Sequence, residues 1–201
     1  VFKNTTSTGG WDKIKADNLE VKLNTTGSGS GIEVQGYYQS TLQLIGNVSV
    51  NATSSANKAV NGIYLSRYNN YVPLMKISGN LTMKNGEDYG VTNGGKAVEG
   101  ATGNYGVAGI LAIGKNYGGE SDTELEVTGK TDLKIDGSAV VASDQAKVYL
   151  RGETYIEVNK DAAEGFANYA LETTSGTTFI EATNAKDIKG NIGILGGGTI
   201  T

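Results

Sequence analysis

Apolar or β-branched side chains alternate with polar ones on both sides of a glycine in five nine-residue segments of the chain. The segments are 42–50, 75–83, 125–133, 148–156 and 186–194, and their central glycines are Gly46, Gly79, Gly129, Gly152 and Gly190. A two-residue period indicates a half-buried strand and not a helix. The glycine suits a tight bend because it accepts a positive φ. Each segment is therefore predicted to be two short β-strands joined by a bend.

A third short apolar segment precedes each of these strand pairs. The third segments are 31–34, 62–65, 109–112, 139–142 and 169–171, and a degenerate sixth pair near the start of the chain has Asp17 in place of the glycine. The shortest interval between glycines, 23 residues from Gly129 to Gly152, is close to one turn of a solenoid, so the longer intervals contain insertions. We expect an all-β fold over residues 1–201: a single right-handed parallel β-helix (β-solenoid) of about five to six coils, each with three short strands and loop insertions.

The alternation also separates side chains that face the core from those that face solvent. The predicted inward column is Leu42, Leu44, Val48, Val50, Ile77, Leu81, Met83, Leu125, Val127, Leu133, Val148, Leu150 and Ile156. The predicted outward neighbours are Gln43, Ser49, Lys76, Thr82, Glu124, Glu126 and Lys134. Asn47, Asn80 and Asn191 follow three of the glycines and would stack as an amide ladder if the coils are in register. The alternative is that Gly-Asn is only a favourable turn pair.

Insertions distinguish one coil from another. Three of them connect a third strand to the next strand pair, at Gln35–Ser40, Ser66–Pro73 and Gly114–Asp122. If the coils are in register, these three insertions emerge on one side of the solenoid. A longer Gly-rich insertion covers Asn85–Val107; a structureless loop of that length is usually functional or mobile, although a plain spacer is the alternative. Tyrosine mixed with polar residues is typical of recognition surfaces. The candidate binding residues are Tyr37, Tyr38, Arg67, Tyr68, Tyr71, Tyr89, Tyr105 and Tyr117, unless each tyrosine only covers its own loop.

The composition narrows the chemistry available to the chain. It has 30 glycines, one proline, no cysteine and no histidine, and its net charge is −4. An acidic chain does not favour nucleic acid, which requires basic patches. Disulfides, thiolate or histidine zinc sites and histidine-based nucleophilic catalysis are excluded. The chain has no run of about 18 apolar residues, the length needed to span a membrane. We predict no cofactor and no metal site, and leave open whether the long insertion binds Ca²⁺.

Four carboxylates that lie close in sequence are the candidates for polysaccharide chemistry: Glu124, Glu126, Asp132 and Asp136. Two carboxylates about 5–9 Å apart would serve a glycosidase. These four flank Lys130 and Lys134 and alternate outward, which is the pattern of a solvated face. We therefore predict no catalytic residues. A polysaccharide-processing β-helix enzyme is the alternative from another functional class.

Three short motifs carry a family resemblance: Gly46-Asn47 followed by Val-Ser-Val, Gly79-Asn80 followed by Leu-Thr-Met, and Gly-Ile-Tyr-Leu at 62–65. From about residue 19 to 201 the chain resembles the passenger domains of bacterial type V autotransporter adhesins, which are pertactin-like β-helices. The resemblance implies a segment of a longer, extracellular passenger on a Gram-negative cell, anchored in the outer membrane through a translocator that is not in this chain. It implies a non-enzymatic role in adhesion, aggregation or biofilm formation. The partners would be a host surface protein or glycan, or self-association between cells. A passive stalk that presents a distal head is a further alternative.

Overall fold

The computed structural model describes residues 12–36, 40–67, 72–96, 98, 106–114, 123–160 and 168–201. Within these ranges the chain forms β-strands and no helix, and accordingly contains no apolar helix of bilayer-spanning length. Among the described strands, the hairpin of β6 (Leu81–Asn85) and β7 (Asp88–Tyr89) is the one antiparallel pair; the other pairings are parallel. The predicted all-β fold with parallel strands is confirmed.

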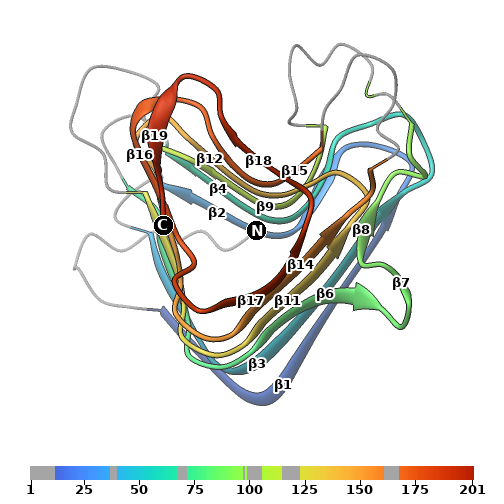
Figure 1. Ribbon diagram of the computed structural model, residues 1–201. Coiled ribbons are helices and arrows are strands. Elements are labelled where there is room, and N and C mark those ends of the chain that lie inside the picture. Colours follow the sequence, from blue (N-terminus) through green and yellow to red (C-terminus); the bar gives the residue numbers. More distant parts are fainter. Residues whose placement is uncertain are drawn as a thin grey trace.

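The parallel strands form three ladders, and each repeat of the chain adds a strand to each ladder (Figure 1). Ladder one contains the first parts of β1 (Asp12–Thr25) and β3 (Thr41–Ser54), followed by β5 (Leu74–Ile77), β10 (Glu124–Val127), β13 (Lys147–Leu150), β16 (Gly176–Glu181) and β19 (Gly197–Ile200). Ladder two contains the second parts of β1 and β3, followed by β6, β8 (Val91–Thr92), β11 (Thr131–Ile135), β14 (Thr154–Val158) and β17 (Ala185–Lys189). Ladder three contains β2 (Gly29–Gly36), β4 (Val60–Arg67), β9 (Val107–Ile113), β12 (Ser138–Ser143), β15 (Tyr169–Thr173) and β18 (Asn191–Ile194).

An aliphatic core lies between the ladders. All thirteen side chains that were predicted to face inward are buried, with exposed fractions of at most 2%. Ladder three adds Ile32, Ile63, Ile110 and Val140, which stand side by side in register. The predicted outward residues alternate with the buried column and are partly exposed. Burial of each large aliphatic side chain contributes about 1.5–3 kcal/mol, so this column is the main source of stability.

Four of the predicted glycines stand in one column where ladder one meets ladder two. A Cβ added to Gly79 would lie 2.1 Å from the carbonyl oxygen of Gly46. The same addition at Gly129 or Gly152 would lie 2.4 or 2.2 Å from the carbonyl oxygen of the glycine one repeat earlier. Glycine is therefore required by the close approach of stacked backbones. The predicted reason, a positive φ, applies within this column to Gly46, whose φ is +119°.

The prediction that Gly190 is the fifth bend glycine is wrong. β17 pairs with β14 so that Ile188 lies beside Ile156, which places the residues before Gly190 on ladder two. The bend of the last repeat comes earlier, at Asn184, whose carbonyl oxygen accepts the backbone amide of Thr154. The segment imitates a bend because β17 and β18 follow each other directly, with Gly190 between them.

An amide ladder follows the glycine column, with different members from those predicted. Asn47 Nδ2 donates to Asn18 Oδ1 at 3.2 Å, and Asn47 Oδ1 accepts the backbone amide of Asn80 at 3.2 Å. Asn80 Oδ1 in turn accepts the backbone amide of Lys130 at 2.8 Å. Asn191 lies beside Tyr169 on ladder three and takes no part. Asn18 belongs to the degenerate first pair, whose place in the stack is thereby confirmed.

The Gly-rich insertion, predicted as a loop over Asn85–Val107, is partly made of strands. After the β6–β7 hairpin the chain returns to ladder two as β8, where Val91 lies beside Ala52 and Ile135. Val91 is fully buried, so the aliphatic core continues across repeat three. A turn at 93–96 follows, and residues 97 and 99–105 lie outside the described part of the chain.

The inward column can be tested with one buried and one outward substitution. Leu44→Asp should lower the free energy of unfolding by more than about 4 kcal/mol, because it buries an unpaired charge among apolar side chains. Ser49→Asp, on the partly exposed side of the same strand, should change it by less than about 0.5 kcal/mol. Circular dichroism and urea unfolding measure both. Equal tolerance of the two substitutions would contradict the assigned register.

The glycine column can be tested in the same way. Gly129→Ala should cost about 1–3 kcal/mol, because the new methyl group collides with the backbone of Gly79. Gly176→Ala is the matched control, since a Cβ at Gly176 meets nothing within 4 Å. Urea midpoints of the two variants should therefore differ clearly. A Gly129→Ala protein as stable as the control would show that the backbones are not packed this closely.

Candidate functional site

The three insertions that connect ladder three to ladder one have stacked anchors. Ladder three ends in register at Gln35, Ser66 and Ile113, and ladder one begins in register at Thr41, Leu74 and Glu124. The insertions therefore leave and return at one edge of ladder three, which is the arrangement expected of in-register coils. Residues 37–39, 68–71 and 115–122 themselves lie outside the described part.

The opposite edge of ladder three also receives insertions. There the chain passes from ladder two to ladder three, and residues 99–105 of repeat three and 161–167 of repeat five intervene, again outside the described part. Around them the strands stay in register, with Val91 beside Ile135 on ladder two and Val107 beside Val60 on ladder three. The bend between ladders one and two receives none, so ladder three alone is bordered by insertions on both edges.

The outer face of ladder three carries an apolar cluster that is separate from the central core. Ala108, Leu111 and Val141 form it, and the partly buried Tyr64 and Ile113 pack against it. Tyr64, Leu111 and Val141 are neighbours on successive strands. Figure 1 shows ladder three bowed toward the core, so that this outer face is concave. Ladder three differs in this respect from ladders one and two, whose outer faces carry charged side chains.

A carboxylate stands at each end of this apolar row. Glu33 lies beside Tyr64, and Glu172 lies beside Val141. Glu172 is only 1% exposed, and its Oε2 accepts a hydrogen bond from Ser138 Oγ at 3.4 Å. Ser138 Oγ also accepts the backbone amide of Tyr169 at 3.2 Å. Ala108, Leu111 and Val141 are themselves at most 4% exposed, so the cluster is a second buried layer of ladder three and not an open contact surface.

The structure places two of the eight predicted binding residues. Tyr37, Tyr38, Tyr68, Tyr71, Tyr105 and Tyr117 lie outside the described part. Arg67 ends β4 and is 6% exposed, so it is buried and not the exposed loop residue that was predicted. Tyr89 lies on the β6–β7 hairpin, with Lys134 Nζ 5.7 Å from its ring centroid. Tyr89 therefore lies on the hairpin that projects from ladder two, whereas Arg67 ends a strand of ladder three.

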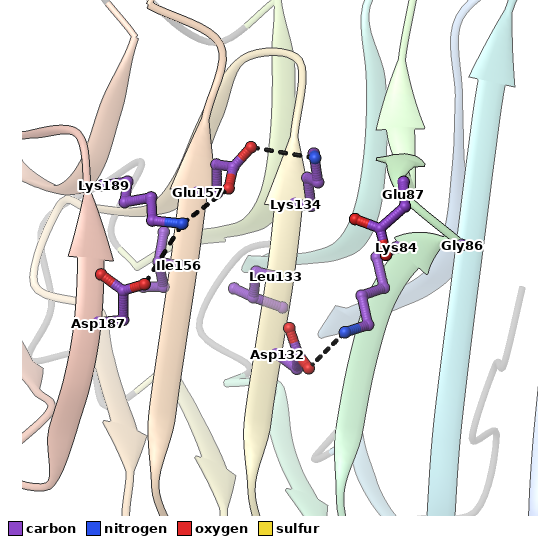
Figure 2. A pocket seen from close by; sticks show the side chains of 10 residues that line it. All are labelled: Lys84, Gly86, Glu87, Asp132, Leu133, Lys134, Ile156, Glu157, Asp187 and Lys189. Carbon is purple, nitrogen blue, oxygen red and sulfur yellow. Dashed lines mark hydrogen bonds and ion pairs between the residues drawn. The ribbon is translucent and has the colours of Figure 1, made fainter.

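A second candidate site is a small pocket of about 130 Å³ beside the β6–β7 hairpin, on the outer side of ladder two (Figure 2). Its charged side chains are Lys84, Glu87, Asp132, Lys134, Glu157, Asp187 and Lys189. Lys84 Nζ lies 2.8 Å from Asp132 Oδ2, and Lys134 Nζ lies 3.0 Å from Glu157 Oε1. Lys189 Nζ lies 3.3 Å from Glu157 Oε2. Hydrogen bonds from Lys134 and Lys189 lower the pKa of Glu157.

The charges of this pocket come from neighbouring strands and are paired with one another. Lys84 is on β6, Asp132 and Lys134 on β11, and Glu157 on β14, so each pair connects two repeats. The lysines are occupied by carboxylates of the same surface, and a ligand would have to displace them. We therefore assign the pocket to stabilisation of the stack and regard ladder three as the better candidate for binding.

A similar charged row crosses ladder one. Lys76 Nζ lies 2.7 Å from Glu126 Oε2, and Arg151 pairs with both Glu126 and Glu181. The hydrogen bond from Lys76 is the main cause that lowers the pKa of Glu126, against a smaller opposing effect of burial. The guanidinium of Arg151 also stacks 4.3 Å from the ring centroid of Tyr149. Glu126 is partly exposed on this face, as its outward position in the alternation predicted, and the structure adds its ion pairs.

Asp136 departs from that prediction. It was grouped with the solvated carboxylates, but it is 8% exposed and buried in the turn after β11. The alternation of β11 ends at Ile135, so the outward parity of the strand no longer applies to the next residue. Asp136 is therefore a buried polar residue at the edge of ladder three that the sequence pattern misassigned.

Known proteins give no further guide to the site. Comparison with family models, with curated proteins and with solved structures found no match to this chain. Among the described residues, no group of three or more acidic side chains is placed to hold a metal ion. The candidate site is therefore defined by geometry: the outer face of ladder three and the anchors of the insertions on its two edges.

The charged rows predict a pH dependence of stability. The pKa of Glu126 and Glu157 is lowered from 4.5 on folding, so their stabilisation is present above that value and is lost as the pH falls through the folded-state pKa. Glu126→Gln should lower the free energy of unfolding at pH 7 by about 0.2–1 kcal/mol. The difference from the wild type should shrink in urea titrations as the pH falls below 4.5 and through the lowered pKa of Glu126. A difference independent of pH would show that the charge of Glu126 contributes nothing.

Proposed function

We propose that this chain is a segment of a cell-surface adhesin that binds its partner over ladder three. The observation that carries the proposal is the placement of the insertions on both edges of that ladder, with anchors in register. A rigid scaffold that holds variable connections around one face is the usual way in which proteins build a binding surface. The apolar cluster of Ala108, Leu111 and Val141 lies between these two edges; it is at most 4% exposed, so it would stiffen the scaffold there and would not itself contact the partner.

We propose in addition that the scaffold is a right-handed parallel β-helix. Support comes from the order of the ladders: the chain visits ladder one, ladder two and ladder three in turn and then returns beside its previous strand. Parallel strands connected in this way cross over right-handedly in about 98% of cases. A scaffold of this kind can lengthen by adding repeats.

The resemblance to autotransporter passengers supplies the location and the class of partner. The Gly-Asn bends at Gly46 and Gly79, on which the resemblance rests, lie in the glycine column of this chain. We therefore propose an extracellular, outer-membrane-anchored, non-enzymatic passenger segment. Its partner would be a host surface protein or glycan, or the same protein on a neighbouring cell. Tyrosines of the insertions at 68–71 would supply rigid, amphipathic contacts of the kind that recognition loops use.

A binding screen with matched variants tests this function. The protein would be screened on a glycan array, on host matrix proteins and for self-association, and the strongest partner titrated against variants. Tyr68→Ala and Tyr71→Ala should each weaken binding about tenfold or more, as loss of an aromatic anchor does. Tyr149→Ala, on the charged outer face of ladder one, is the control and should leave the affinity unchanged.

Three results would contradict the proposal. Unchanged affinity in both Tyr68→Ala and Tyr71→Ala would remove the insertions at that edge from the binding surface. Release of products from a bacterial or plant polysaccharide would indicate the enzyme. Failure of this chain to bind any partner that a longer form of the protein binds would indicate a passive stalk.

A further inference from the structure

Asp136 is a buried carboxylate at the corner where ladder two passes into ladder three. Its Oδ2 accepts a hydrogen bond from Thr92 Oγ1 at 2.5 Å, and its Oδ1 accepts one from Asn159 Nδ2 at 2.6 Å. Thr92 belongs to repeat three, Asp136 to repeat four and Asn159 to repeat five. One side chain therefore connects three successive repeats at this corner, and we name these three residues the Asp136 cluster.

The contact with repeat three fixes the start of an insertion. Thr92 Oγ1, besides donating to Asp136, accepts the backbone amide of Gly94 at 2.8 Å. Asn93 is 1% exposed; its Oδ1 accepts the amide of Lys96 at 3.1 Å, and its Nδ2 donates to the carbonyl oxygen of Lys96 at 2.9 Å. The turn at 93–96 is thereby held just before residues 99–105. A Cβ at Gly95 would lie 3.8 Å from Asp136 Oδ1, so the turn passes directly over the carboxylate.

The contact with repeat five fixes both ends of another insertion. Asn159 lies just before residues 161–167, and its backbone amide donates to the carbonyl oxygen of Ile135 at 3.0 Å. Its own carbonyl oxygen accepts a hydrogen bond from Asn168 Nδ2 at 2.7 Å. Asn168 is the first described residue after the insertion. The two ends of this insertion are thus tied to each other and, through Asn159, to Asp136.

We propose that Asp136 is a positioning residue for the binding surface: it holds the ends of both insertions on the second edge of ladder three in a fixed relation to each other. A carboxylate suits this role because its two oxygens accept separate bonds, and bonds to an ionised acceptor are short and strong. Because the cluster is buried, the loss of either hydrogen bond would leave a donor without an acceptor or water, which costs free energy of folding. The importance of this arrangement for binding rests on the proposed function, whereas the arrangement itself does not.

Native-state hydrogen exchange tests the proposal with four variants. Asp136→Ala should raise exchange rates about tenfold or more in peptides covering both 92–98 and 159–169, because it removes both acceptor oxygens and leaves the Thr92 hydroxyl and the Asn159 amide without their partner. Thr92→Val should raise the rates at 92–98 alone, and Asn159→Ala those at 159–169 alone. Asp132→Asn is the control: it removes a surface carboxylate paired with Lys84 and should change neither.

Each outcome decides between a positioning and a general structural role. Exchange that increases throughout the strands of all three ladders in Asp136→Ala, or in one peptide only, would overturn the proposal. If Asp136→Ala does not fold, the two single-sided variants decide, because equal effects of each on both peptides would overturn it. The binding screen is a separate arm: absence of any partner contradicts the proposed function, while the exchange data still decide the role of Asp136.

Discussion

The close stacking of the central repeats depends on one steric constraint, the contact between Gly46, Gly79, Gly129 and Gly152 where ladder one meets ladder two. The carbonyl oxygen of each glycine occupies the space in which the next glycine would carry a Cβ. Backbones can approach this closely only if the side chain is absent, and the approach brings the adjoining strands into hydrogen-bonding distance on both sides. The aliphatic column of Leu44, Ile77 and their neighbours then closes because the strands that carry it are already in register.

Alternation in the sequence predicted the strands and the buried column correctly because a two-residue period reports directly on which side of a strand a residue lies. It failed at Gly190, where two strands of different ladders meet without a loop and their joint pattern imitates a bend. The conformational argument for the glycines was also incomplete. A single sequence shows that glycine is present, but the carbonyl oxygen that excludes a side chain at Gly129 comes from Gly79, far away in the chain.

The sequence predicted the candidate site less well than it predicted the fold, and for a different reason. Side chains at strand ends and corners do not follow the two-residue period of a strand. Asp136 was therefore assigned to the surface and Arg67 to an exposed loop, although both are buried. The outer apolar cluster was missed because Leu111 and Val141 continue the hydrophobic run of their strands. A signal was present: β9 and β12 are apolar at successive positions, which indicates burial on both faces of a strand.

The β6–β7 hairpin shows how this architecture tolerates change. Repeat three leaves ladder two after Met83, makes a complete hairpin and resumes the same ladder at Val91, while the strands on either side stay paired in register. A gain or loss of residues at such a point is absorbed within one repeat, since each repeat contacts only the repeats next to it. Proteins with this architecture can therefore change the length and sequence of a hairpin while the buried core stays the same. A foreign epitope inserted at Gly86 would likewise leave the ladders unchanged.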